Sequence, residues 1–165
     1  MIIHFFGLIG MILIVSSIQM KNKDKYLLLQ LLGNIAFVIN FVMLEAYSGA
    51  LISTIIGTQA LTILLYLKNN KEAPNIVIYT FISIVLISAF ILVRNVIDLL
   101  PILAALTMLF IFLQKQEKNI RKLSITISLL WIPYAIYFNA YFAIATNVIF
   151  LISNIISIIR YDFKK

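Results

Sequence analysis

Residues 75–93 read NIVIYTFISIVLISAFILV, a run of nineteen residues without one charged side chain. An α-helix of about 20 apolar residues crosses the roughly 30 Å hydrocarbon layer of a bilayer. Lys71 and Glu72 precede this run and Arg94 follows it, so charges mark both of its ends. The stretch predicts a transmembrane helix, and with it an all-α membrane fold.

The rest of the chain has the same character. Hydrophobic residues make up 63% of the 165 residues and charged residues 12%, against about 45–50% and about 25% in soluble domains. A soluble globule of this size needs more polar groups to cover its surface. We therefore expect a polytopic protein whose partner is the lipid bilayer, with seven transmembrane helices in the apolar runs Ile2–Met20, Tyr26–Tyr47, Gly49–Leu67, Asn75–Val93, Val96–Leu113, Leu123–Phe138 and Ala140–Tyr161.

The basic residues alternate in position along the chain. Twelve of the thirteen Lys and Arg residues follow the first, third, fifth and seventh runs, and Arg94 alone lies on the other side. Cytoplasmic loops of membrane proteins carry the excess of Lys and Arg. The pattern predicts an N-terminus outside and a C-terminus in the cytoplasm. It also accounts for the net charge of +7 without a nucleic-acid partner.

Two very short connections, Ser48-Gly49 and Phe138-Asn139, predict two tight helical hairpins. At an offset of 90 residues, Gly57 falls on Asn147, and Phe41 and Leu44 fall on Trp131 and Tyr134. This predicts two parallel three-helix bundles related by an axis along the membrane normal. The expected units are residues 1–67 for the first bundle, 68–95 for a linker helix and 96–165 for the second bundle.

A 3+1+3 arrangement of helices with an outside N-terminus resembles the SWEET sugar carriers and their PQ-loop and nicotinamide-riboside-carrier relatives. Three short motifs narrow the comparison: the Gly7/Gly10 pair, Asp98-Leu99-Leu100-Pro101, and the segment from Asn154 to Ile158-Ile159-Arg160-Tyr161. With these motifs the chain most resembles, within that group, the YgjV family of small bacterial inner-membrane proteins. The resemblance implies a multi-pass protein of the bacterial inner membrane.

SWEET-type carriers hold their solute between the two triplets with an Asn on the third helix of each. The resemblance gives that role to Asn147, whereas Gly57 stands at the other position. Polar groups inside a bilayer normally face a cavity or a neighbouring helix, so each is either a ligand-binding group or an interhelical hydrogen bond. The candidate substrate-binding residues are Asn40, Gly57, Trp131, Tyr134, Asn147 and Asn154.

Catalytic and metal-binding patterns are missing from the sequence. It has no cysteine, one histidine and no Walker, HExxH or GxSxG motif, so we expect neither an enzyme nor a cofactor. Glu45 is expected to reach water at the outer end, and Asp98 either to pair with Arg94 or to cap the helix that contains Pro101. The expected function is facilitated transport of a small polar solute. The alternative is a non-transporting membrane sensor or adaptor.

Overall fold

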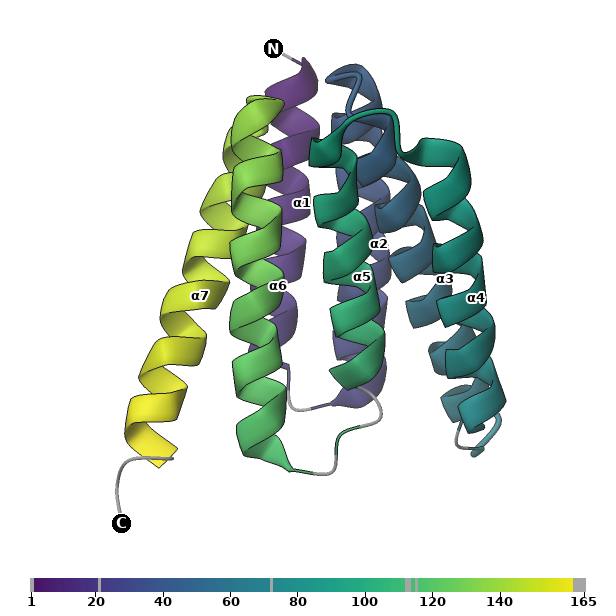
Figure 1. Cartoon of the computed structure of the whole chain (residues 1–165). Coiled ribbons are helices and arrows are strands. Elements are labelled where there is room, and N and C mark those ends of the chain that lie inside the picture. Colours follow the sequence, from purple (N-terminus) through teal and green to yellow (C-terminus); the bar gives the residue numbers. More distant parts are fainter. Residues whose placement is uncertain (1, 21, 72, 112–113, 115, 162–165) are drawn as a thin grey trace.

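A computed structural model of the chain describes residues 2–20, 22–71, 73–111, 114 and 116–161. These residues form seven α-helices and one short 3-10 helix, which confirms the all-helical class (Figure 1). The elements are α1 (Ile2–Ile18), α2 (Lys23–Met43), α3 (Tyr47–Lys68), α4 (Asn75–Leu92), η1 (Val96–Asp98), α5 (Leu99–Ile111), α6 (Glu117–Tyr137) and α7 (Tyr141–Tyr161).

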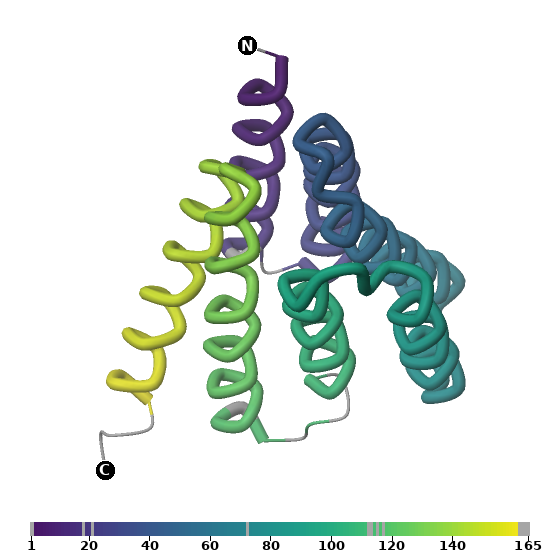
Figure 2. Tube along the Cα trace, turned by 45° about the horizontal axis from the view of Figure 1, so that its top comes forward, coloured from purple at the N-terminus to yellow at the C-terminus, as the bar shows by residue number. Residues whose placement is uncertain are grey.

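Six of the helices pack in a ring. Going round it, α1 packs against α2, α2 against α3, α3 against α5, α5 against α6, α6 against α7 and α7 back against α1. The remaining helix, α4, packs against α3 and α5 (Figure 2). Toward its C-terminal end α7 leans away from the other helices (Figure 1), and its buried residues, Ala143 and Thr146, lie in its first two turns.

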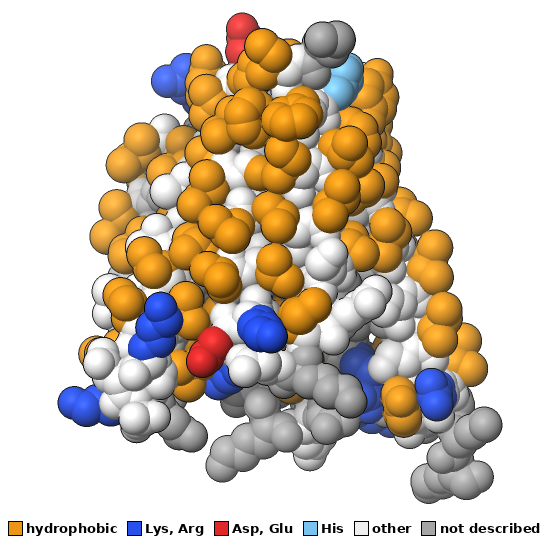
Figure 3. Space-filling view, turned by 180° about the vertical axis from the view of Figure 1, so that it is seen from behind, with side chains coloured by type: hydrophobic (Ala, Val, Ile, Leu, Met, Phe, Trp, Pro, Cys, Tyr) orange, Lys and Arg blue, Asp and Glu red, His pale blue; other side chains and the backbone are white. Residues whose placement is uncertain are grey.

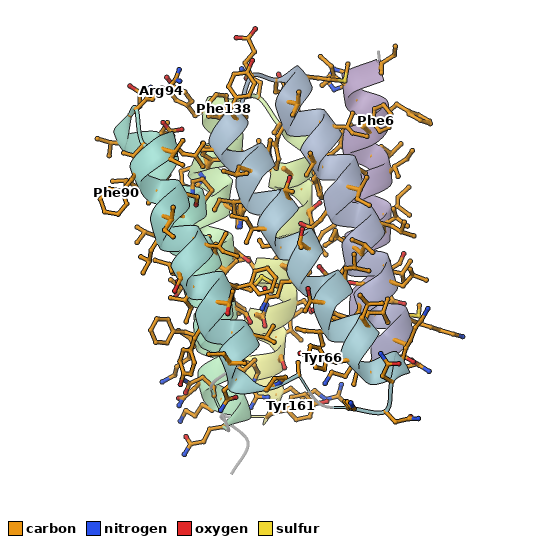
Figure 4. The ribbon with its side chains drawn as sticks, turned by 90° about the vertical axis from the view of Figure 1, so that its right-hand side faces the viewer. Phe6, Tyr66, Phe90, Arg94, Phe138 and Tyr161 are labelled. Atoms are coloured by element: carbon orange, nitrogen blue, oxygen red, sulfur yellow. The ribbon has the colours of Figure 1, made fainter. Side chains whose placement is uncertain are left out.

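The bundle has two chemically different ends. At one end, here called the hairpin end, lie the short turns between α2 and α3 and between α6 and α7, together with Arg94 and Phe138 (Figure 4). At the other, here called the basic end, lie Tyr66 and Tyr161. Seen from behind, Lys and Arg side chains gather at the basic end and hydrophobic side chains cover the middle (Figure 3).

The outer surface of the helices is strongly apolar. Phe90 is 92% exposed and points away from the bundle (Figure 4), and Val96 is 82% exposed. Four helices, α2, α3, α4 and α7, are long and apolar enough to cross a membrane. The apolar helices α1 and α5 are shorter, and α6 opens with the charged sequence EKNIRK.

The helix boundaries differ from those predicted at several places. The turn predicted at Ser48-Gly49 spans residues 44–46 instead, because α2 ends at Met43, Glu45 has a positive φ and α3 already begins at Tyr47. α6 begins at Glu117, six residues before the predicted Leu123, because Glu, Lys and Arg are good helix formers and extend the helix beyond its apolar part. The predicted helix from Val96 is a 3-10 turn followed by α5 from Leu99. Its predicted end at Leu113 lies outside the described residues.

The two hairpins correspond at an offset of 94 residues, because α2 and α6 begin 94 residues apart and so do α3 and α7. Each turn has one residue with positive φ, Glu45 at 58° and Asn139 at 54°. In each, the N–H of the following alanine, Ala46 or Ala140, bonds to the carbonyl five residues back. The offset of 90 predicted from side-chain matches is one helical turn away from this register.

Candidate functional site: a central polar cavity

A cavity of about 320 Å³ lies inside the ring of helices. Volumes of roughly 300–1,000 Å³ are typical of sites for small molecules. All six ring helices contribute to its wall. The lining residues are Ile14, Tyr26, Gln30, Asn34, Phe37, Phe41, Ser53, Ile56, Met108, Ile111, Ile120, Ser124, Ile127, Ser128, Trp131, Ala143, Thr146, Asn147 and Phe150.

Three carboxamides line the cavity, and each has its amino group engaged. Asn34 Nδ2 donates to the carbonyl of Gln30 (2.8 Å), and Asn147 Nδ2 donates to the carbonyl of Ala143 (2.9 Å). Gln30 Nε2 donates to Ser17 Oγ (2.8 Å). Within the described part of the chain, the three carboxamide oxygens have no hydrogen-bond donor. They are therefore available to a molecule in the cavity.

Two hydrogen-bond donors are also available. The hydroxyls of Ser124, Ser128 and Thr146 each donate to a carbonyl of their own helix. Ser53 Oγ and the indole N–H of Trp131, by contrast, have no partner among the described residues and are not sealed from solvent. The wall thus offers acceptors and donors together.

Aromatic rings line the cavity toward the hairpin end. Phe37 stacks on Phe41 with ring centroids 5.9 Å apart, and Phe41 stacks on Trp131 at 5.7 Å with 15° between the ring planes. Tyr134 meets Trp131 edge to face and is fully buried. Stacked and edge-to-face pairs of this kind are each worth about 0.5–1.5 kcal/mol beyond the area that they bury.

Beyond these rings a buried hydrogen-bond cluster joins the two hairpins. We call Ser48, Gly49, Asp98 and Tyr134 the hairpin-end cluster. Ser48 Oγ donates its one proton to Asp98 Oδ1 (2.6 Å), so Tyr134 Oη donates to Ser48 Oγ (2.9 Å). The Gly49 N–H in turn donates to Tyr134 Oη (2.7 Å). Each of these bonds ties the start of α3 to η1 or to α6.

The Asp98 carboxylate also organises its own segment. Its Oδ2 accepts from the backbone N–H groups of Asn95 (3.0 Å) and Arg94 (3.2 Å), completing a capping box at η1. Within the described residues no ion pair links it to the Arg94 side chain, which is exposed. Of its two predicted roles the structure therefore has neither as predicted: the carboxylate caps η1, and its two backbone bonds go to residues before η1 and not to the first turn of α5, which contains Pro101.

The structure places the predicted site residues in three different settings. Trp131 and Asn147 line the cavity together, from neighbouring helices α6 and α7. Tyr134 belongs to the hairpin-end cluster. Asn40 is absent from the lining of this cavity, because its Nδ2 donates instead to the carbonyl of Ile3 in α1 (2.8 Å).

The last two predicted residues lie away from the cavity. Gly57 faces α2, where a Cβ would lie 3.3 Å from the Cβ of Asn34. At the offset of 94, the counterpart of Asn147 is Ser53 and not Gly57. Asn154 donates to the carbonyl of Phe150 in its own helix (2.9 Å), half-buried on the part of α7 that leans outward.

Sequence reasoning missed six polar lining residues, Gln30, Asn34, Ser53, Ser124, Ser128 and Thr146. The first two share a face of α2 with Phe37 and Phe41, at spacings of three and four residues that place side chains in one row. The sequence alone shows this row of side chains. It does not show which neighbouring helix the row faces.

Two other expectations concern the exposure of Glu45 and the binding of metal ions. Glu45 is exposed in the turn between α2 and α3 at the hairpin end, as predicted for a carboxylate that reaches water. In the described part of the chain no group of three His, Cys, Asp or Glu side chains could hold a metal ion.

Comparisons with known proteins identify a family for this arrangement. The model of the Imp-YgjV family, described as bacterial inner membrane protein, matches residues 1–165, the whole chain. This confirms the resemblance to the YgjV proteins. No curated protein and no solved structure matches the chain.

Proposed function

The chain belongs to the Imp-YgjV family of bacterial inner membrane proteins, and we propose that it carries a small polar solute across that membrane by facilitated transport. The observation that carries the proposal is the central cavity. Its wall combines carboxamide oxygens, a hydroxyl and an indole N–H that have no partner among the described residues, and polar groups in a bilayer normally face a bundle interior or a pathway.

The second support is the symmetry of the cavity wall. Lining residues fall in pairs 94 residues apart, one from each half of the chain. These pairs are Ile14 and Met108, Tyr26 and Ile120, Gln30 and Ser124, Asn34 and Ser128, Phe37 and Trp131, Ser53 and Asn147, and Ile56 and Phe150. A wall built from equivalent positions supports two parallel three-helix units, residues 1–67 and 96–165, with residues 68–95 as the linker. Repeats of this kind place the solute site between them.

The third support is the difference between the two ends of the cavity. Toward the basic end the lining reaches Tyr26 and Ile120, near the starts of α2 and α6, and Ile111, the last residue of α5. Toward the hairpin end lie the stacked rings and the hairpin-end cluster, and we propose that these close it. A carrier closed at one end and reachable from the other is in one of the two states that alternating access requires.

The orientation of the carrier follows from its charges. We propose seven crossings, with the basic end and the C-terminus in the cytoplasm, because cytoplasmic loops collect Lys and Arg and twelve of the thirteen lie on that side of the predicted spans. The cavity then faces the cytoplasm. Since no charged side chain lies among its described lining residues, the solute gradient is the driving force that we propose.

Flux of radiolabelled solutes into proteoliposomes tests the proposal, across sugars, nucleosides, vitamins and amino acids. We expect saturable uptake of at least one uncharged solute, and loss of most of that uptake in Asn147→Leu. Asn154→Leu is the matched control, because Asn154 makes the same bond to its own helix outside the cavity. Absence of uptake for the whole panel, with a folded protein, would favour the sensor or adaptor alternative.

A further inference from the structure

We propose that the cavity binds an uncharged ring compound that carries an amide-type group, held between Asn34 of α2 and Asn147 of α7. This inference rests on the proposed function, because it assigns the solute class of the same site. It draws on the charge, the polarity and the apolar surface of the cavity wall, and on an unpaired amide beside it.

The first argument is charge. Among its described residues, the lining of the cavity has neither a carboxylate nor a cationic group. A charged solute would lose its hydration there without gaining a counter-charge, and burying an unpaired charge is far more costly than burying a hydrogen-bonded neutral group. The site therefore selects against anions and cations alike.

The second argument is the placement of the two asparagines. At equivalent positions of the two halves, Asn34 corresponds to Ser128, and Ser53 corresponds to Asn147. Because α1 lies between α2 and α7 in the ring, both asparagines flank α1, and both serines lie on helices that flank α5. Carboxamides on one side and hydroxyls on the other give the bound solute one preferred orientation.

These four side chains also lie at similar depth. Asn34 is nine residues before the end of α2, and Asn147 is six residues after the start of α7. At about 1.5 Å per residue, the two lie within roughly 5 Å of each other along the bundle axis. A single small molecule can reach both carboxamide oxygens, and those oxygens require N–H or O–H donors on the solute.

A third argument comes from a small side cavity of about 20 Å³, next to the central one. It is lined in part by Gln30 and Gln59, and it shares Tyr26, Ile56 and Met108 with the central cavity. Gln59 is 3% exposed, and its Nε2 has no partner among the described residues. A buried amide without a partner is costly, and this space suits one water molecule or a polar atom of the solute. It adds a further polar position beside the central cavity, between α2 and α3.

The fourth argument is the apolar surface beside these amides. The rings of Phe37, Phe41 and Trp131 lie on the hairpin-end side, and isoleucines of α1, α3, α5 and α6 also line the cavity. A flat ring packs favourably against such aromatic surfaces. A purely polar solute would leave most of this wall without a favourable contact.

The test uses the fluorescence of Trp131, the one tryptophan in the chain. The purified full-length protein in detergent is titrated with benzamide, benzoate and benzamidinium, which share a ring and a planar substituent but carry charges of zero, minus one and plus one. We expect benzamide to change the fluorescence saturably, with a Kd at least about tenfold lower than that of either charged analogue. No saturable effect of benzamide, or equal affinity for a charged analogue, would overturn the inference.

Three variants identify the residues involved. Asn34→Leu and Asn147→Leu keep the size of the side chain and remove its hydrogen bonds, and each should weaken benzamide binding about five- to tenfold. Asn154→Leu should leave it unchanged. Gel-filtration and melting profiles confirm that each variant is folded. If all three variants bind benzamide as tightly as the unsubstituted protein, Asn34 and Asn147 are not part of the site.

The outcomes separate this inference from the proposed function. If benzamide binds as expected but no solute enters proteoliposomes, the site stands and the carrier function fails. If a solute is carried but charged analogues bind as well as benzamide, the carrier function stands and the solute class is wrong.

Discussion

At the scale of single residues, neighbours decide what each polar side chain does. Asn34 and Asn40 lie six residues apart on α2 and both are buried. The first lines the cavity, whereas the second bonds to the backbone of α1. The sequence predicted that buried amides would be used, because an unpaired amide in a bilayer is costly. It could not distinguish these two asparagines, since that depends on the rotation of α2 about its own axis.

The glycines of α3 provide a residue-scale prediction. A Cβ on Gly49 would lie 2.6 Å from Tyr134 Cε1 and 2.8 Å from its hydroxyl oxygen, and Tyr134 is fully buried. A Cβ on Gly57 would come no closer than 3.3 Å to a neighbouring atom. We expect Gly49→Ala to cost about 1–3 kcal/mol of stability through overpacking, and Gly57→Ala to cost clearly less. Thermal unfolding of the two variants measures the difference, and equal melting temperatures would contradict the packing at Tyr134.

At the scale of helices, the sequence predicted the number and order of the elements well, because each apolar run is close to the length of a span. The offset between the two hairpins is 94 residues, four more than predicted. Four residues are about one helical turn, so offsets of 90 and 94 keep the same faces of two apolar helices together. Matching of side chains therefore hardly distinguishes the two offsets. The turns that contain Glu45 and Asn139 fix it.

The segment that starts α5 gives an element-scale prediction. Asp98 caps η1 through two backbone N–H groups and accepts the Ser48 hydroxyl. Loss of a capping side chain costs about 0.5–2 kcal/mol, and an unpaired buried partner adds to this. We expect Asp98→Ala to lower the melting temperature by several degrees. Asp24→Ala, at an exposed position in the first turn of α2, is the control and should change it little. Equal changes of melting temperature in Asp98→Ala and Asp24→Ala would contradict a stabilising role of the hairpin-end cluster.

At the scale of the whole molecule, the charge asymmetry predicts the orientation in the membrane. With twelve of the thirteen basic residues on one side of the predicted spans, a fluorescent protein fused after Lys165 should fold and emit in the cytoplasm. Alkaline phosphatase fused at the same place should be inactive, because it needs export to become active. The reverse result for the two fusions would require an even number of crossings or the opposite orientation.

The central claim is that one cavity becomes reachable from both sides of the membrane in turn. Because the natural chain has no cysteine, Ser124→Cys places a single thiol on the cavity wall. A membrane-impermeant maleimide should label it rapidly in inside-out vesicles and slowly in right-side-out vesicles. Adding Ser48→Ala and Tyr134→Phe removes the three hydrogen bonds that these two hydroxyls make at the hairpin end, and should raise outside labelling several-fold. Outside labelling that stays at its original rate when the cluster is broken would contradict the account.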